Sequence, residues 1–293
     1  MKIFLERLLE QESAVSVSKF DWYIKNYQLK SVDYIRVVEP GKVYRNPNTG
    51  LFQKDRLTVQ EYFQSLGIDE YFDPTDRSCL KVMQYRCINP WGYVGYQVGE
   101  ELLIDAGYYL PLVKSVEVAG KLLQCPSFYT GYVSESSWRQ GKQLQVIFHP
   151  DLNHYVLATD INRWQGQFTG KNGIYSFKDL IKGESQDRLI TDLLRHNLSR
   201  LVALLDLENI SLSDVLDKSI CDDIAISLSG ILSCCHLNGV QATADFLINS
   251  TVHEDQIGTT SLDYMRKFAN YDVSEILYSQ DCLFRNYLSG NSL

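Results

Sequence analysis

The chain has 293 residues, of which 45% are apolar and 22% are charged, and its formal net charge is −8. This is the composition of a globular protein with a substantial core, and no apolar run is long enough for membrane insertion. The acidic balance, without any cluster of lysine and arginine, excludes nucleic acid as an expected partner and disfavours tight electrostatic attachment to anionic membranes or cell walls.

The first segment, residues 2–12, is predicted to be an amphipathic helix, because Phe4, Leu5, Leu8 and Leu9 recur at helical spacing. Charged residues interrupt its apolar stretch, so it does not resemble the apolar part of a signal peptide. We therefore expect a protein made in the cytoplasm, whose export would use a phage or a specialised secretion route.

The pattern changes after a second short helix, which is expected at residues 19–27. Residues 32–38 are rich in β-branched side chains, and residues 42–53 form two strand-like runs around an Asn-Pro-Asn-Thr-Gly turn signal. We interpret residues 27–57 as a β-containing insertion. Helical spacing returns at residues 57–68.

The middle of the chain is predicted to alternate between helix and strand. A helix is expected from about Gly99 to a stop at Gly107, and helical spacing is expected to continue through SVEVAGKLLQ at residues 115–124. Residues 144–160 predict a hairpin that turns at His-Pro-Asp-Leu-Asn. This hairpin forms a second insertion, at about residues 140–162.

The rest of the chain is predicted to be almost entirely helical. A long amphipathic helix is expected within residues 178–205, and another over residues 219–239, capped by Ser219 and ended by Gly239. A short helix follows. Because no linker rich in Pro, Gly or Ser interrupts the chain, the simplest architecture is a single domain, residues 1–293, of the α+β class and predominantly helical.

Seven cysteines are scattered along the chain, in an odd number and without Cys-x-x-Cys spacing. This pattern excludes a disulfide framework and a zinc site, and we expect no metal and no cofactor. A cysteine protease would need Cys125, Cys221 or Cys235 near a histidine such as His154 or His236. Nothing in the local sequence supports a nucleophilic cysteine there.

The stretch GYVGYQVGEELLIDAGYY, residues 92–109, combines glycines and tyrosines at the start of a helix. It resembles a motif of bacterial and phage peptidoglycan-cleaving proteins in the lysozyme-like superfamily, Gly-Tyr-x-Gly-(x)-Tyr-Gln-x-Gly-Glu. This chain is one residue shorter between Gly95 and Tyr96. In the related lytic transglycosylases, such a segment lines the cleft opposite the catalytic acid.

Three further stretches resemble motifs of the same family in the same order. Residues 168–180, FTGKNGIYSFKDL, are similar to a Trp-Thr-Gly-Lys-x-Gly-Ile-x-Ser motif, with Phe168 in place of tryptophan. Residues 229–247 are similar to a Ser-Gly-Leu-Leu-Ala-Ala-Ala-His-Leu-x-Gly helix, and residues 255–273 to an Asp-x-x-Gly-Thr-Ser-x-x-x-Tyr-Met motif. Four ordered matches imply a lysozyme-like fold with β-containing insertions.

The resemblance also implies roles for individual residues. The family's catalytic acid stands in a Glu-Ser context after a first helix, which here gives Glu12 and Ser13. Tyr93, Tyr96 and Gln97 are expected to bind substrate, with Gln97 and Tyr96 offering hydrogen bonds and a ring face to N-acetyl groups. The gap between the acid and the Gly-Tyr motif is much longer here than in the family, so a long insertion separates the two.

Further candidates are ambiguous. Glu100 and Asp105 are possible second carboxylates, although the helix dipole alone explains a glutamate in the first turn. His236 and Tyr264 are expected to line the cleft or, equally well, to serve as structural side chains. The implied partner is peptidoglycan or a related β-1,4-linked N-acetylated glycan, and a protein partner is also compatible with the sequence.

Two functions therefore follow from the sequence. One is a lytic transglycosylase or muramidase in which Glu12 is the general acid and base. The other is an inactive lysozyme-like fold that binds a glycan or a protein, for example as a secreted effector. Whether Glu12 lies across a groove from Gln97 is the feature that discriminates between them.

Overall fold

The structure is a computed structural model. It describes residues 1–39, 42–131, 144–149, 152–216, 218–220, 224–255 and 258–277.

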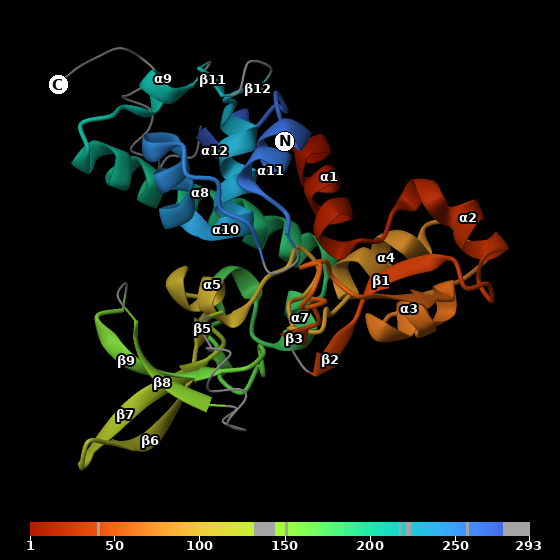
Figure 1. Ribbon diagram of the computed structural model, residues 1–293, viewed down its shortest axis with the longest axis horizontal. Coiled ribbons are helices and arrows are strands. Elements are labelled where there is room, and N and C mark those ends of the chain that lie inside the picture. The colour runs from red at the N-terminus through yellow and green to blue at the C-terminus, as the bar shows by residue number, and fades with distance from the viewer. Residues whose placement is uncertain are drawn as a thin grey trace. The chain divides into compact units, whose positions relative to one another are not determined.

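The chain divides into two compact units, drawn together in Figure 1. Unit 1 comprises Met1–Leu8 and Asp187–Leu293, and unit 2 comprises Leu9–Gln186. Helices hold 46% of the residues and strands 19%, so the predicted α+β class with a predominance of helix is confirmed. The lysozyme-like architecture in a single domain stays a prediction.

Unit 2 contains the end of the first helix, a set of short helices and strands, and the beginning of the longest helix. These elements are α1 (Lys2–Ser13), η1 (Val17–Lys19), α2 (Phe20–Lys25), β1 (Val32–Ile35), β2 (Val37–Glu39), β3 (Lys42–Val43), β4 (Lys54–Leu57), α3 (Val59–Ser65), η2 (Asp69–Tyr71), α4 (Cys79–Arg86), α5 (Glu100–Asp105), β5 (Tyr109–Leu110), β6 (Leu112–Val118), β7 (Lys121–Phe128), β8 (Leu144–His149), β9 (His154–Thr159), β10 (Gln167–Phe168), η3 (Lys171–Gly173), α7 (Phe177–Leu180) and α8 (Gly183–Leu207).

The helices α2, α3 and α4 share one apolar core with the segment that follows α1. Val15, Phe63 and Met83 are fully buried in this core, and the rings of Tyr23 and Phe63 lie edge to face at 5.2 Å. The antiparallel pair β1 and β4 lies between α2 and α3 in the sequence, so the β structure expected at residues 27–57 is present. The residues between α1 and the Gly-Tyr motif therefore form a packed part of unit 2.

A four-stranded sheet has the order β6-β7-β9-β8 (Figure 1). The hairpin of β8 and β9 confirms the expectation for residues 144–160, although Pro150 and Asp151 of its turn lie outside the described residues. The expected helix at residues 115–124 is wrong, because β6 and β7 form an antiparallel pair there, from Leu112 opposite Ser127 to Val118 opposite Lys121. Their two-residue turn has a positive φ at both positions, the conformation that matches the twist of antiparallel strands.

Unit 1 contains the rest of α8 and a set of mostly helical elements. These are α9 (Leu212–Val215), β11 (Ser219–Ile220), β12 (Ile224–Ala225), α10 (Leu228–Asn249), α11 (Ser261–Lys267) and α12 (Ser274–Leu277).

The helix α10 begins later than the sequence predicted. Ser219 lies in β11, and Ser227 is the N-cap, because its hydroxyl accepts a hydrogen bond from the Gly230 amide at 3.2 Å. Gly239 adopts φ 82° and ψ 167°, which interrupts the helical backbone where its end was predicted. The predicted helix and the short helix after it therefore correspond to the two halves of α10.

Small side chains let α10 and α11 approach closely in unit 1. A Cβ added at Gly230 would lie 2.4 Å from the sulfur of Met265, so any other residue there would force Met265 to shift. The Ser229 hydroxyl donates to the carbonyl of Phe268 at 2.6 Å, and the Cys234 thiol donates to the carbonyl of Ser261. The motif SGILSCC thus has a packing explanation that is independent of any chemistry.

Candidate active site

Glu12 lies in the last turn of α1, at the end of its apolar face. Phe4, Leu5, Leu8 and Leu9 are buried, as predicted. Glu12 follows Leu8 by four residues and Leu9 by three, so its side chain continues the same face of the helix. The residue is half-buried. A carboxylate therefore stands where the helix pattern would otherwise place an apolar residue.

The chain turns sharply after this helix. Ala14 has a φ of +54°, a left-handed conformation that ends helices and is unusual for a residue with a side chain. Ser13 is 1% exposed, and its hydroxyl accepts a hydrogen bond from the Val15 amide at 3.3 Å. Ser13 thus stabilises the turn and, being buried, has no surface for a substrate.

Gln97 contacts Glu12 directly. Its side-chain Nε2 donates to the backbone carbonyl of Glu12 at 2.7 Å, across 85 positions of sequence. The last carbonyls of a helix have no partner within the helix, so this bond satisfies one of them. The Gln97 amide therefore lies directly against the backbone of Glu12 in unit 2, and not across a groove from that backbone.

Two further side chains bind the next free carbonyls. The Tyr62 hydroxyl, on α3, donates to the carbonyl of Ala14 at 2.9 Å. The Gln84 amide, on α4, donates to the carbonyl of Val15 at 2.6 Å. We call Tyr62, Gln84 and Gln97 the carbonyl clamp. Each member comes from a different element, so the turn after Glu12 is fixed from three directions.

The loop before Gln97 fixes the orientation of its amide. Asn89 donates from Nδ2 to Oε1 of Gln97, and its own Oδ1 accepts from the amides of Trp91 and Tyr93 at 2.9 and 3.1 Å. Gln97 itself has a φ of +57°. Both polar atoms of the Gln97 side chain are therefore engaged within the protein, and the sugar contact expected for it would compete with these bonds.

The glycines of the Gly-Tyr motif are required by close contacts. A Cβ on Gly95 would lie 2.1 Å from Oε1 of Gln186, a fully buried side chain that donates to the Tyr85 carbonyl at 2.7 Å. A Cβ on Gly99 would lie 2.4 Å from the ring of Tyr93 and 2.9 Å from Oδ1 of Asn162. The spacing of the motif thus has a packing reason.

The tyrosines of the motif face inward. Tyr96 is fully buried, and its ring lies edge to face with Tyr85 at 6.2 Å. The expectation that Tyr96 offers its ring to a sugar is therefore wrong, because no face of that ring is accessible. Tyr93 is half-buried beside Tyr129, with 5.8 Å between the ring centres, and burial raises the pKa of its hydroxyl. Of the tyrosines in residues 92–109, Tyr93 alone is not fully buried.

Glu100 is a buried carboxylate that joins distant segments. It is 2% exposed and accepts hydrogen bonds from the amide of Trp164 at 2.7 Å and from the amides of Tyr129 and Arg163 at 3.3 Å. Burial raises the pKa of this carboxyl, and these donors partly oppose the rise. Because its oxygens bind backbone amides, Glu100 is placed to stabilise the fold and does not face an open site.

Asn162 completes the N-terminus of α5. Gly99 at the N-cap position has no side chain to accept the first free amides of the helix. Oδ1 of Asn162 accepts from the Glu100 amide at 2.7 Å instead, while its Nδ2 donates to the carbonyl of Trp91 at 2.9 Å. Asp105, the other carboxylate considered from the sequence, is half-buried at the end of α5.

His236 and Tyr264 belong to unit 1, whereas Glu12 and Gln97 belong to unit 2. His236 is half-buried on α10. Tyr264 is 2% exposed, and its ring packs against Phe268 at 5.3 Å. Burial leaves Tyr264 no ring surface for a substrate, so its structural role is the one that its surroundings support.

The described cysteines do not offer a nucleophile. Burial raises the pKa of the Cys235 thiol to about 12 and that of Cys87 to about 12, with a smaller contribution to Cys87 from the charge of Glu12. Cys125 is fully buried. The thiols of Cys87 and Cys235 therefore remain protonated near neutral pH. Cys221 and Cys282 lie outside the described residues.

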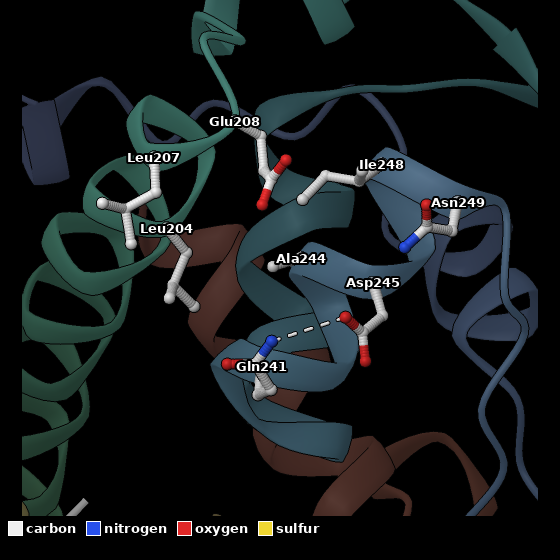
Figure 2. A pocket seen from close by; sticks show the side chains of 8 residues that line it. All are labelled: Leu204, Leu207, Glu208, Gln241, Ala244, Asp245, Ile248 and Asn249. Atoms are coloured by element: carbon white, nitrogen blue, oxygen red, sulfur yellow. Dashed lines mark hydrogen bonds between the residues drawn. The ribbon is translucent and has the colours of Figure 1, made fainter.

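A pocket of about 360 Å³ lies within unit 1, where the end of α8 faces the second half of α10 (Figure 2). Figure 2 shows Leu204 and Leu207 on one side and Glu208 between the two helices. The pocket is lined by Leu204, Leu207, Glu208, Gln241, Ala244, Asp245, Ile248 and Asn249. None of these residues is among the site residues predicted from the sequence.

Three members of this site have no signal in the sequence. Tyr62 and Gln84 occupy ordinary helix positions, so nothing distinguishes them from other polar residues of short helices. Asn162 caps a helix that begins 62 positions earlier, which no local pattern can reveal. Asn89 is different, since the dipeptide Asn-Pro at this position is a turn signal that could have located the loop.

Within the described residues, no group of three or more His, Cys, Asp or Glu side chains is placed to hold a metal ion. None of the helices in the described parts of the chain combines the length and the apolar character that crossing a bilayer requires. No protein-family model, curated protein or solved structure matches this chain.

Proposed function

We propose that this chain is a peptidoglycan-cleaving glycosidase of the lytic transglycosylase or muramidase kind, with Glu12 as its general acid and base. The observation that carries the proposal is the hydrogen bond from the Gln97 side chain to the backbone of Glu12 at 2.7 Å. The resemblance to the lysozyme-like superfamily implies that the acid and the Gly-Tyr-Gln motif belong to one site. Their contact across the long intervening segment agrees with that implication.

The surroundings of Glu12 suit an acid. A carboxylic acid must keep its proton near neutral pH to protonate a glycosidic oxygen, and partial burial favours the protonated form. Glu12 is half-buried on the apolar face of α1. The fixed backbone at residues 12–15 gives the carboxyl a defined starting geometry.

The reaction would proceed in two proton transfers. Glu12 gives its proton to the oxygen that links the two sugars, and the bond between that oxygen and C1 breaks. The 6-hydroxyl oxygen of the same N-acetylmuramic acid then bonds to C1, and its proton passes to the Glu12 carboxylate. An anhydro sugar results, and the acid is regenerated. If water attacks C1 instead, a reducing sugar results. Glu12 again gives one proton and takes one back.

The alternative is a glycan-binding or protein-binding module that has lost catalysis. The burial of Tyr96 and the engaged amide of Gln97 favour it, because two of the expected sugar contacts are not available. In this alternative the contacts around Glu12 maintain the fold alone.

The decisive experiment compares wild type, Glu12→Gln and Glu10→Gln on purified peptidoglycan, with muropeptides identified by mass spectrometry. Glu10 is the matched control, since it lies on the same helix and accepts a hydrogen bond from the Ser16 hydroxyl. We expect muropeptide release by wild type and Glu10→Gln, and a loss of at least about a hundredfold in Glu12→Gln. Equal release by wild type and Glu12→Gln would refute the assignment of the acid. Glycan binding without release by any of the three would favour the binding module.

A further inference from the structure

We infer that the carbonyl clamp, Tyr62, Gln84 and Gln97, positions Glu12 for catalysis through its backbone, and that Gln97 is a positioning residue and not a ligand of the sugar. This inference rests on the proposed function, because it assigns roles around the same acid. It differs from the role that the family resemblance implies for Gln97.

The first argument is the pattern of the hydrogen bonds. The clamp donates to the carbonyls of Glu12, Ala14 and Val15 at 2.7, 2.9 and 2.6 Å. The Glu12 carbonyl is one of the last four of α1, which have no partner within the helix, and the carbonyls of Ala14 and Val15 belong to the turn that follows. Because the donors belong to α3, α4 and the loop after it, rotation of the end of α1 would break bonds on more than one side.

The second argument is that the clamp residues are themselves fixed. Gln84 is 2% exposed and Tyr62 is 8% exposed, so both side chains are enclosed by the protein. Burial raises the pKa of the Tyr62 hydroxyl, which therefore remains a hydrogen-bond donor at every physiological pH. Asn89 holds the amide oxygen of Gln97, which leaves its Nε2 directed at the carbonyl of Glu12.

The third argument concerns the intervening segment. The donors at Tyr62 and Gln84 lie in the stretch that separates Glu12 from the Gly-Tyr motif, and this stretch packs on Val15 in one core. An insertion that merely covered a cleft would not need buried polar side chains directed at the turn that follows the acid. Buried polar groups are retained where they are fully hydrogen-bonded, and here their bonds converge on one turn.

The test uses Gln97→Met, Gln84→Met and Tyr62→Phe, each of which removes one donor with little change in volume. Thr243→Val is the control, since Thr243 is a fully buried residue of unit 1 whose hydroxyl donates to the Gly239 carbonyl at 2.9 Å, so the substitution also removes one buried donor with little change in volume. On peptidoglycan we expect kcat to fall about tenfold to a hundredfold in the clamp variants, with KM within about twofold of wild type. The control keeps its kcat. A rise in KM at unchanged kcat in Gln97→Met would overturn the inference, because a sugar ligand behaves in that way.

A second readout does not depend on activity. In protein labelled with ¹³C in the glutamate carboxyls, the signal of Glu12 is assigned by its loss in Glu12→Gln, and its titration midpoint is followed by NMR. A positioning role predicts that the midpoint moves in all three clamp variants and stays unchanged in Thr243→Val. An unchanged midpoint in the clamp variants would refute the inference. If wild type neither cleaves nor binds glycan, the proposed function fails, while this titration still decides whether the clamp sets the environment of Glu12.

Discussion

Replacement of Gly95 by alanine tests the packing of the Gly-Tyr motif. Gly95 has a φ of +53°, and an added Cβ would lie 2.1 Å from Oε1 of Gln186. The left-handed backbone alone costs about 1–2 kcal/mol for a residue with a Cβ. Gln186 has to move away, which breaks its bond to the Tyr85 carbonyl and leaves a buried polar group unsatisfied, at a further cost of about 1–3 kcal/mol. We therefore expect Gly95→Ala to lower the free energy of unfolding by about 2–5 kcal/mol.

Gly107→Ala is the control for this prediction. Gly107 also has a positive φ, +74°, but nothing lies within 4 Å of its added Cβ, so only the backbone cost of about 1–2 kcal/mol applies. Urea unfolding of the full chain, followed by circular dichroism, measures both variants. In a Gln186→Ala background the cost of Gly95→Ala should fall to that of Gly107→Ala. Equal destabilisation by Gly95→Ala and Gly107→Ala would refute the reasoning, because the clash with Gln186 would then add nothing to the loss in free energy of unfolding.

Three other predictions concern stability. The raised pKa of Glu100 means that the folded chain binds this proton more readily than the unfolded chain, so stability falls as pH rises from the ordinary carboxyl pKa through the raised one. Glu100→Gln should abolish this part of the fall in melting temperature. A pH profile of the melting temperature that is the same as that of wild type would contradict the prediction. Asn162→Ala removes the cap of α5 and the bond to the Trp91 carbonyl, and should lower the free energy of unfolding in urea by about 2–3 kcal/mol. A loss of less than about 0.5 kcal/mol would show that water replaces both bonds. Ser227→Ala should lower the free energy of unfolding by about 1 kcal/mol and leave muropeptide release unchanged, as a melting curve and a muropeptide assay would measure. No loss of stability would mean that α10 begins elsewhere.

The elements that the sequence predicts well are those with a complete local signal. The first helix combines four apolar residues at helical spacing with charged residues on the other face, and α1 matches it within one residue. The hairpin of β8 and β9 has strand-like runs on both sides of its turn. By contrast, SVEVAGKLLQ contains an alternation of valine with polar residues and an Ala-Gly turn. These signals favour strands, and the apolar residues at 122–123 obscured them.

The candidate site was predictable only in part. The sequence identified Glu12 and Gln97 through a resemblance, and these two residues are in contact. It could not identify Tyr62 or Gln84, because a side chain that binds a distant carbonyl leaves no periodic pattern around itself. The roles expected for Tyr96 depended on exposure, which is decided by tertiary packing and not by residue type.

The carbonyl clamp also has a consequence for biosynthesis. Its three bonds span 48, 69 and 85 positions of sequence, and in each case the acceptor on the α1 side is made first. During translation, at about 5–20 residues per second, the end of α1 therefore waits several seconds for its partners. A nascent chain that ends before residue 97 holds the Glu12–Ser13 turn with incomplete support, and ribosome-bound chains of increasing length should acquire protease resistance in this region only after the loop that carries Gln97 has left the exit tunnel.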